Sequence, residues 1–419
     1  MSEHIQSIRG MHDSAPKDTA TTRLLESKLI AVLAQYGYGE VRTPIVEKLE
    51  LFKRSIGEVT DIVEKEMYHF QDRGGDWLAL RPEGTASTLR AGVQHGWLHN
   101  QQQRFWYLGP FFRRERPQKG RYRQFHQLGV ETFGMTGPDI DLELILLSQA
   151  MWQAVGLRVE NLELQINTLG DQQARGLHRQ ELINYFSDHL TSLDEDAQRR
   201  LHTNPLRILD SKNPDVQQIV KNAPLLFDFL APEAKEHFEQ LMAGLEQMGV
   251  SAQLNPTLVR GLDYYNRTVF EWITTELGAQ GTICAGGRYD GLVGQMGGRE
   301  TPAAGFAVGI ERLHSLIEHN LTHQVPQLDA YVVVLGETAS KFALQVCQQI
   351  RSSRPDLAIQ MNCGGGSIKS QMKRADRAQA RMAIIIGDDE VVRGQVTLKD
   401  LQNDVPQTVC DLDQIAEKL

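Results

Sequence analysis

An arginine-rich segment, residues 111–131, holds the side chains of this 419-residue chain best suited to chemistry. Up to residue 127 it carries six basic residues and one acid, Glu115, in a protein whose formal net charge is −9. The basic residues are Arg113, Arg114, Arg116, Lys119, Arg121 and Arg123. A positive field concentrated on an acidic protein is expected to face an anion. The segment therefore predicts a site for a triphosphate, a nucleic-acid backbone or both, with a solvated loop as the alternative.

The residues around this segment predict a β-hairpin with a basic loop. Apolar, strand-like runs flank it, and Pro117 and Gly120 mark the turn. Phe125 and His126 are planar side chains among the arginines, which suits stacking on a base. Glu131 ends an apolar strand, where an unpaired carboxylate is costly to bury, so it needs a cationic or hydrogen-bonding partner.

A second cluster, residues 258–265, joins a cation, an acid and two phenols. Arg260 is followed by Asp263, Tyr264 and Tyr265. Strand alternation predicts that the two tyrosines lie on opposite faces, one in the core and the other toward a ligand. The alternative is an ordinary strand with a surface arginine.

Two further positions combine charge with a predicted helix start. Arg312 falls in the first turn of a helix after an apolar strand, where it opposes the helix dipole. Its position predicts a nearby anion, or a local ion pair with Glu311. In the turn at residues 81–85, Glu83 beside Thr85 is suited to binding an ammonium group or to capping a helix that begins near Ala86.

The composition limits the class of protein. A hydrophobic content of 41% and a charged content of 23% are ordinary for soluble globular proteins. No apolar run approaches the roughly 18 residues needed to span a bilayer, and the N-terminus lacks the apolar stretch of a secretory signal. The four cysteines have no CxxC spacing and predict reduced thiols. We therefore expect a cytoplasmic protein with no membrane partner, and its acidity argues against coating of DNA.

Patterns along the chain predict two domains. Helices are expected over residues 19–35 and 138–155, strands over 162–169 and 254–274, and a strand leading into a helix over 305–319. The polar, helical stretch at 171–247 is interpreted as an insertion, or else as part of one larger domain. Beyond a short linker at 322–328, strands alternate with helices, which predicts a small α/β domain with mainly parallel strands.

A basic stripe is predicted on one helix of this C-terminal domain. The helix opens after the glycines at 364–366, and its basic residues recur every four positions. They are Lys369, Lys373, Arg377 and Arg381. The stripe is suited to contacting an RNA backbone, and the alternative is a solvated face.

The order of these features resembles the class II aminoacyl-tRNA synthetases. Residues 19–44, 105–134 and 303–319 are similar to motifs 1, 2 and 3 of that class. Residues 258–265 (LVRGLDYY) and 285–292 (AGGRYDGL) resemble the two signature peptides of the histidyl-tRNA synthetase family. The stretches 8–13 and 81–85 match the same family, so that the resemblance covers essentially the whole chain.

This resemblance implies an α+β fold. An antiparallel sheet flanked by helices would occupy residues 1–325 and contain the helical insertion at about 171–247. Residues 326–419 would form an α/β anticodon-binding domain. The helix and strand of motif 1 imply a homodimer.

The resemblance also implies how ATP is bound. Arg113 would hold the α-phosphate and Arg312 the γ-phosphate of a bent ATP. Phe125 would stack on adenine with Glu115 near its amino group, and Arg121 would complete the ATP set. Arg260 would neutralise charge on the α-phosphate as the histidine carboxylate attacks, which makes Arg260 and Arg113 the catalytic residues. Mg²⁺ would accompany ATP, with ligands that the sequence does not indicate.

The histidine and tRNA sites follow from the same resemblance. Polar side chains would bind the amino and carboxylate groups of histidine and both nitrogens of its ring. They are Glu83, Thr85 and Gln127 for the former, and Glu131 and Tyr265 for the latter, with Tyr264 and Tyr289 lining the pocket. For tRNA(His), the implied residues are Arg116 and Gln118 at the acceptor end, and Lys369, Lys373 and Arg377 at the anticodon stem-loop.

The implied reaction has two steps, formation of histidyl-adenylate and transfer to the 3′ end of tRNA(His). Nucleotidyl transfer needs mostly positioning and charge stabilisation, which arginines supply. A pocket that pairs both ring nitrogens can discriminate by roughly 10⁴–10⁵ without editing, and the insertion shows no hydrolytic constellation.

Three other interpretations are weaker. A histidine-sensing regulatory subunit of ATP phosphoribosyltransferase typically lacks the signature arginines, whereas Arg113, Arg260 and Arg312 are all present. The threonyl, prolyl and glycyl enzymes of the same class are disfavoured by LVRGLDYY. A pure RNA-binding module would leave the acids Glu83 and Glu131 unexplained.

Overall fold

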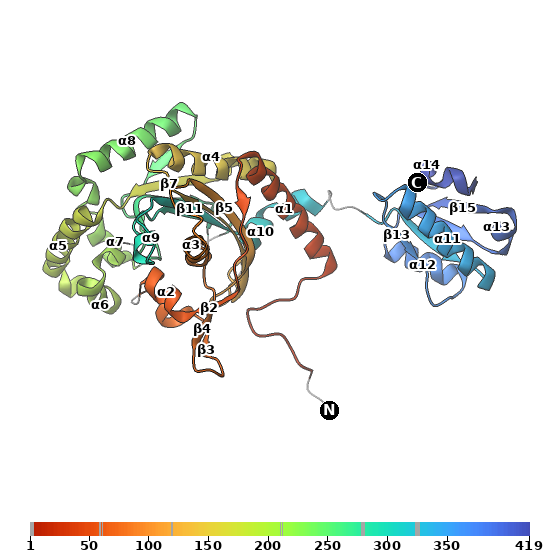
Figure 1. The fold of residues 1–419 in the computed structure, drawn as a ribbon, viewed down its shortest axis with the longest axis horizontal. Coiled ribbons are helices and arrows are strands. Elements are labelled where there is room, and N and C mark those ends of the chain that lie inside the picture. Colours follow the sequence, from red (N-terminus) through yellow and green to blue (C-terminus); the bar gives the residue numbers. More distant parts are fainter. Residues whose placement is uncertain are drawn as a thin grey trace. The chain divides into compact units, whose positions relative to one another are not determined.

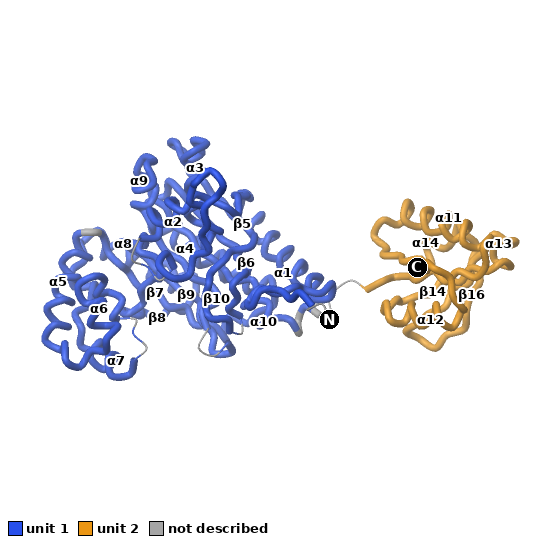
Figure 2. Tube along the Cα trace, turned by 90° about the horizontal axis from the view of Figure 1, so that it is seen from below, with its two compact units in different colours: residues 1–323 blue, residues 324–419 orange. Residues whose placement is uncertain are grey.

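The computed structural model describes residues 4–57, 60, 62–118, 120–209, 211, 213–277, 281–322 and 327–419. It divides into two compact units, Met1–His323 and Gln324–Leu419 (Figure 2). Lys119 of the basic loop, most of the predicted linker and the predicted boundary at residues 325–326 lie outside the described residues. Within the described ranges, no helix is both long and apolar enough to cross a membrane.

An eight-stranded sheet forms the centre of the first unit (Figure 1). In spatial order its strands are β1 (Gly39–Glu40), β5 (Gln103–Phe112), β6 (Gln124–Phe133), β11 (Ala303–Gly309), β10 (Thr282–Arg288), β9 (Asn266–Ile273), β7 (Glu163–Thr168) and β8 (Ala252–Leu254). All neighbours are antiparallel except the two edge pairs, β1 with β5 and β7 with β8. The predicted hairpin is β5 and β6, joined by the basic loop.

Helices cover one face of this sheet. They are α1 (Pro16–Gln35), α4 (Pro138–Ala154), α8 (Pro232–Gln247) and α10 (Ile310–Thr322). Proline in the first turn starts α1, α4 and α8, because its missing N–H costs nothing there. On α1, Leu25, Leu29 and Val32 recur at helical spacing and pack into the shared core with Trp152 and Trp272.

Smaller elements lie on the opposite face. They are α2 (Leu49–Ile56), α3 (Thr85–Gln94), α9 (Leu292–Gln295), a π-helix (Ile62–Glu66) and a three-stranded sheet in the order β2 (Val46–Lys48), β4 (Trp77–Leu80), β3 (His69–Gln71). Successive strand residues point to opposite faces, so that on β9 Phe270 joins the helix-covered core while Val269 packs with Leu89 of α3. The face that carries α3 also carries the candidate site.

The helical stretch after β7 has a small core of its own. Its elements are α5 (Gln172–Asp188), α6 (Glu195–Thr203) and α7 (Pro214–Val220), with 3₁₀ turns at Leu190–Ser192, Pro205–Ile208 and Leu226–Phe229, and a further 3₁₀ turn at Val159–Asn161 precedes β7. Phe186, Leu201 and Val216 belong to this separate cluster. The last helix, α8, does not, because Phe238 and Leu241 pack into the core of the main sheet. We use the name inserted module for residues 171–230.

The second unit is a five-stranded sheet with helices. Its strands lie in the order β13 (Ile359–Met361), β12 (Ala330–Val334), β14 (Met382–Ile386), β15 (Gln395–Asp400), β16 (Thr408–Asp411). Its helices are α11 (Glu337–Ser353), α12 (Ile368–Arg377), α13 (Asp388–Arg393), a 3₁₀ turn (Leu412–Gln414) and α14 (Ile415–Lys418). The first three strands are parallel, and β15 and β16 are antiparallel.

The prediction of mainly parallel strands is therefore wrong for the end of this sheet. Only α13 and its flanking glycines, Gly387 and Gly394, connect β14 with β15. A parallel connection needs a crossover of a dozen or more residues. Gly394 ends α13 in a left-handed conformation, with φ 65°, and the chain turns back antiparallel.

Candidate active site

A pocket on the α3 face of the large sheet gathers most of the predicted site residues. It is lined by side chains from β5, β6, β9, β10 and β11, from the basic loop, from the 258–265 segment and from the first turns of α3 and α10. The predicted residues on its wall are Glu83, Thr85, Arg113, Glu115, Arg121, Phe125, Gln127, Arg260, Tyr264, Tyr265 and Arg312.

Three half-buried arginines converge on this pocket from two directions. Arg113 and Arg121 come from the basic loop, and Arg312 from the first turn of α10. Burial lowers the pKa of each, and repulsion from the other two lowers that of Arg312 further. An anion in the pocket would relieve both costs, because opposite charge favours the charged form. The arrangement therefore provides a cationic cradle for phosphate.

Backbone carbonyls hold two of these arginines in place. Arg113 Nε donates to Pro82 O at 2.9 Å, and its guanidinium lies 5.5 Å from the ring centre of Phe125. Arg312 Nε donates to Gly120 O at 3.1 Å and its second nitrogen to Thr282 O at 2.7 Å. Arg312 thereby joins α10 to the basic loop and to β10. Arg121 pairs with Glu115.

Arg260 is positioned by an acid that the sequence reasoning missed. Its guanidinium pairs with Glu271 on β9 and lies 5.5 Å from the ring centre of Tyr265. Glu271 also accepts a hydrogen bond from Thr282 Oγ1 at 3.1 Å. A lone acid in an apolar strand is the signal that pointed to Glu131, and the same signal applies to Glu271.

The prediction that Tyr264 and Tyr265 point to opposite faces of a strand is wrong. β9 begins at Asn266, and residues 261–264 form bends and turns, so that strand alternation does not apply to them. Both rings are buried, lie 4.7 Å apart between centroids and line the same pocket. The 258–265 segment, hereafter the pocket loop, therefore places both tyrosines beside Arg260.

Glu131 is enclosed by hydroxyl groups directly behind the pocket wall. Its carboxylate accepts hydrogen bonds from Thr85 Oγ1 at 2.8 Å, from Tyr107 at 3.1 Å and from Tyr289. The side chain is 1% exposed, and burial raises its pKa to about 8 although the hydroxyl contacts oppose the shift. The predicted need for a hydrogen-bonding partner at Glu131 is confirmed, and Tyr107 is a partner that the sequence reasoning missed.

Tyr107 reaches Glu131 because two glycines leave room for its ring. A Cβ at Gly84 would lie 2.1 Å from Tyr107 Cζ, and a Cβ at Gly129 would lie 2.0 Å from the same atom. Any side chain at either position would displace the ring. No sequence signal singled out Tyr107, since a tyrosine in an apolar strand is ordinary.

Glu83 performs the capping role that was one of its two interpretations. Its carboxylate accepts hydrogen bonds from the backbone N–H of Thr85 at 2.6 Å and of Ala86 at 3.0 Å, at the start of α3. Burial raises the pKa of Glu83. The same carboxylate lines the pocket, so that a ligand ammonium group would meet an acid whose position is already set.

Phe125 and His126, both predicted to suit stacking on a base, are successive residues of β6 and point to opposite faces of the strand. Phe125 lies on the pocket wall. His126 Nδ1 lies 2.9 Å from Glu311 Oε1, and this contact raises the pKa of His126. Glu311 thus pairs with His126 and does not form the predicted local pair with Arg312.

The predicted tRNA-contacting residues lie outside this pocket. Arg116 borders a separate cavity with Arg9, Arg114 and Arg123, and Gln118 closes the hairpin tip through paired backbone hydrogen bonds with Arg121. In the second unit, Lys369, Lys373 and Arg377 are exposed on α12. The prediction that Arg381 is the fourth member of the stripe is wrong. The helix α12 ends at Arg377, and Arg381 contacts the carbonyl of Leu419.

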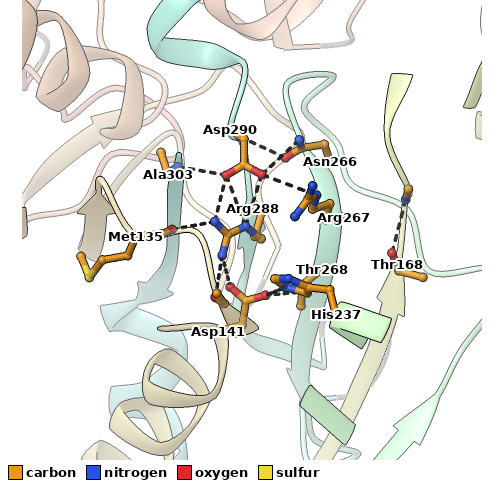
Figure 3. Close-up of polar contacts among 12 residues, drawn as sticks. Met135, Asp141, Thr168, His237, Asn266, Arg267, Thr268, Arg288, Asp290 and Ala303 are labelled. Atoms are coloured by element: carbon orange, nitrogen blue, oxygen red, sulfur yellow. Dashed lines mark hydrogen bonds and ion pairs between the residues drawn. The ribbon is translucent and has the colours of Figure 1, made fainter. Parts of the chain in front are cut away.

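A buried ionic network surrounds Arg288, the residue before Tyr289 in the sequence (Figure 3). Arg288 is 1% exposed and donates to Asp141 at 2.7 Å and to Asp290 at 3.1 Å. Its remaining hydrogen bonds reach the carbonyls of Met135 and Gly137, so that all five N–H groups have acceptors. The network fixes both neighbours of Tyr289, whose hydroxyl contacts Glu131.

His237 extends this network to α8. Its Nε2 lies 2.8 Å from Asp141 Oδ2, which also accepts from Thr268 Oγ1 at 2.7 Å (Figure 3). Asp141 therefore joins α4, α8, β9 and β10.

An antiparallel sheet with a long arginine hairpin, a cationic pocket on one face and an arginine in the first turn of the following helix defines a class II aminoacyl-tRNA synthetase. The family described as Histidyl-tRNA synthetase matches residues 10–313, and the family described as Anticodon binding domain matches residues 329–419. The chain belongs to the histidyl-tRNA synthetase family. It is a histidine–tRNA ligase, which activates histidine with ATP and charges tRNA(His).

Solved structures agree with this assignment. The chain is similar to apo S. aureus histidyl-tRNA synthetase, with 33% identity, a TM-score of 0.81 and 99% of each chain covered. Histidyl-tRNA synthetase from Nostoc sp. PCC 7120 shares the fold at 21% identity, with a TM-score of 0.70 and 99% of each chain covered. A Bacillus halodurans ATP phosphoribosyltransferase regulatory subunit/histidyl-tRNA synthetase shares it at 23% identity and a TM-score of 0.65, covering 90% of this chain and 97% of its own.

Proposed function

We propose that the pocket binds ATP on its arginine side and histidine on its tyrosine side. The observation that carries this proposal is the convergence of Arg113, Arg121 and Arg312, which repel one another in the absence of an anion. Arg113 would bind the α-phosphate, Arg312 the γ-phosphate and Arg121 would add to the same field. Phe125 would stack on adenine, with Glu115 beside the amino group of the base.

Histidine would lie between α3 and the pocket loop. Glu83, Thr85 and Gln127 would bind its amino and carboxylate groups, while Glu131 and Tyr265 would bind its ring nitrogens. Tyr264 and Tyr289 would pack beside the ring. The proposal is supported by the depth of Glu131, since a buried carboxyl raised to a pKa of about 8 accepts or shares a proton near neutral pH. A ring without two nitrogens would leave these polar groups unpaired.

Arg260 would act during adenylate formation. Attack of the histidine carboxylate on the α-phosphate increases the negative charge there in the transition state. A fixed guanidinium on the pocket wall would stabilise this transition state more than the ground state. Its pairing with Glu271 holds the side chain in place before ATP arrives. Arg260 and Arg113 are therefore the proposed catalytic residues.

Mg²⁺ would enter this pocket with ATP. Within the described ranges, no group of three or more His, Cys, Asp or Glu side chains is arranged to hold a metal ion. Magnesium commonly binds through one or two carboxylates, phosphate oxygens and water, and the pocket offers such carboxylates singly, at Glu115, Glu271 and Glu311. The ion would neutralise phosphate charge alongside the arginines.

The tRNA would contact both units. Arg116 and Gln118 at the hairpin tip would meet the acceptor end, and the exposed residues Lys369, Lys373 and Arg377 would contact the anticodon stem-loop. Phosphate contacts by lysine and arginine account for much of the affinity of such complexes. We propose residues 1–325 as the catalytic domain and 326–419 as the anticodon-binding domain.

We propose that the protein is a cytoplasmic homodimer. Exposed apolar side chains gather at the three-stranded sheet, at Ile45 (41% exposed), Val46 (40%), Phe70 (44%) and Trp77 (52%). Val46 and Phe70 share one face of this sheet, because they pair with Leu80 and Leu78 of β4, and exposed apolar side chains on one face are typical of an interface. Sedimentation equilibrium of the wild type and of Phe70→Glu tests the oligomeric state, and a wild-type monomer would contradict the proposal.

The first experiment is ATP–pyrophosphate exchange with each of the twenty amino acids. Exchange with histidine alone is expected, because only its ring pairs both Glu131 and Tyr265. Exchange with several amino acids would contradict the proposed pocket, and histidine binding without any exchange would contradict the catalytic roles of Arg260 and Arg113.

A further inference from the structure

The inserted module holds the pocket loop from behind. Arg175, on the first turn of α5, donates a hydrogen bond from its guanidinium to the backbone carbonyl of Tyr265 at 2.9 Å. Arg175 is half-buried, so that this contact is shielded from competing water. The module is thus bonded to the main chain of a residue that lines the pocket.

A second contact reaches the same loop at Asp263. Its Oδ1 lies 3.5 Å from Asn204 Nδ2 and 3.9 Å from the guanidinium of Arg207, both in the inserted module. On the other side, the backbone N–H of Asp263 donates to Ile56 O at 3.3 Å, and a Cβ at Gly57 would lie 2.9 Å from Asp263 Oδ2. Asp263 therefore lies between the module and the end of α2.

Apolar side chains fill the space between these polar contacts. Leu226 and Leu230 at the end of the module belong to one buried cluster with Leu258, Tyr264 and Tyr265 of the loop. A small cavity remains between the module and the loop, bordered by Arg175, Arg207 and Arg260 among others. The module therefore packs against the loop over its length and does not touch it at one point only.

The loop depends on such contacts because it lacks a strand ladder. Residues 258–265 are irregular, and pairing with the sheet resumes only at Asn266. A segment without regular backbone pairing is positioned by its side-chain and capping contacts. Displacement of a reacting group by about 1 Å can cost about a hundredfold in rate.

We propose that Arg175 and Arg207 are positioning residues for histidine activation, and that the inserted module sets the placement of Arg260 and Tyr265. This inference rests on the proposed roles of those two residues in the pocket. It assigns the module a part in the first half-reaction, before tRNA is present. Arg175 acts through the loop backbone and Arg207 through Asp263.

Histidine-dependent pyrophosphate exchange without tRNA tests the proposal. Arg175→Met removes the hydrogen bond and keeps an aliphatic side chain. We expect kcat/KM for histidine to fall about tenfold, the effect of losing one charged hydrogen bond to a positioned segment. KM for ATP should change less than about twofold, since Arg113, Arg121 and Arg312 lie on other elements. Arg175→Lys, which keeps one donor, should recover most of the loss.

Arg179→Met is the matched control. Arg179 lies one turn further along α5 and donates to His202 O at 2.6 Å, a contact within the module that does not reach the loop. Its loss should leave exchange unchanged. If Arg175→Met also leaves exchange unchanged, or if it and the control reduce exchange equally, the proposal is wrong. A loss confined to tRNA charging would likewise overturn it and assign the contact to tRNA.

A second measurement covers the case in which Arg175→Met lowers the melting temperature. Arg207→Met, Asp263→Asn and the double variant form a double-mutant cycle. The fold decrease in kcat/KM for histidine in the double variant should be smaller than the product of the two single decreases. Purely multiplicative effects would overturn the role of Arg207. A wild type without histidine-dependent exchange would instead contradict the proposed pocket chemistry, which is a distinguishable failure.

Discussion

Arg260 and Glu271 form an ion pair across the pocket wall, one from an irregular loop and the other from strand β9. Their side chains are only 17% and 15% exposed. The pair therefore lies in a partly dehydrated site where charges interact more strongly than in water. Glu271 also accepts a hydrogen bond from Thr282 on β10. Two strands of the sheet, β9 and β10, therefore fix the position of Arg260.

Arg260→His should slow adenylate formation far more than it weakens histidine binding. Its proposed interaction grows as charge develops on the α-phosphate, so that a loss of about 10²–10³ in the chemical step is expected. Single-turnover quench experiments measure that step, and equilibrium dialysis measures binding. Glu271→Gln, which keeps the arginine, should lose less. Equal losses in rate and affinity would remove Arg260 from the catalytic residues.

Glu131→Gln should flatten the pH dependence of stability. Burial raises the pKa of Glu131 to about 8 from an ordinary value of 4.5. Between these values the folded protein keeps a proton that the unfolded chain releases, so that the free energy of unfolding falls as pH rises through this window. Glutamine resembles the neutral acid and is free of this decline.

The wild type and Glu131→Gln should therefore have similar free energies of unfolding at pH 5. At pH 8.5 the free energy of unfolding of the variant should be higher, by on the order of a few kcal/mol. Chemical denaturation at both pH values measures the difference. Glu163→Gln, at an exposed position on β7, is the control and should show no such divergence. If the free energy of unfolding changes with pH in parallel for wild type and Glu131→Gln, Glu131 is ionised in the folded protein at neutral pH.

Removal of the basic residues on α12 should weaken tRNA charging and spare histidine activation. The triple variant replaces Lys369, Lys373 and Arg377 with alanine. Loss of three phosphate contacts should reduce the slope of log affinity against log salt by about 2–3. Filter binding of tRNA(His) at several salt concentrations measures the slope, with Lys341→Ala, at an exposed position on α11, as the control. An unchanged slope would place the anticodon contact elsewhere.

Arg288→Met should destabilise the first unit by about 3–5 kcal/mol, because it leaves the buried carboxylate of Asp141 without its arginine partner. Urea unfolding measures the loss. Arg299→Met removes an exposed arginine that contacts Asn100, and should cost less than about 0.5 kcal/mol. A small effect at Arg288 would show that the network relaxes or admits water.

Much of the site was predictable from local features. The basic loop lies between two strands because apolar runs flank it, and Arg312 lies in a first helical turn because an apolar strand and then a helical pattern surround it. The need of Glu131 for partners followed from its place in an apolar strand. Residue type and short-range periodicity are sufficient to predict these features.

Errors arose where the chain leaves a regular element. Strand alternation does not apply to Tyr264 and Tyr265, because they precede β9, and the helical spacing that includes Arg381 extends beyond the end of α12 at Arg377. The antiparallel return of β15 was missed because its connection is short. Element boundaries depend on capping and packing that a periodic pattern does not contain.

The sequence by itself determined which chemical groups are present and the elements that carry most of them, since residue type and hydrophobic period are local properties. Only the tertiary structure decided which groups meet. Thr85 reaches Glu131 across 46 residues, and Asp141 reaches Arg288 across 147. Such pairs depend on strand register and helix packing over the whole sheet. The burial that raises the pKa of Glu131, like the contact of Arg175 with the pocket loop, belongs to the fold because no local segment creates it.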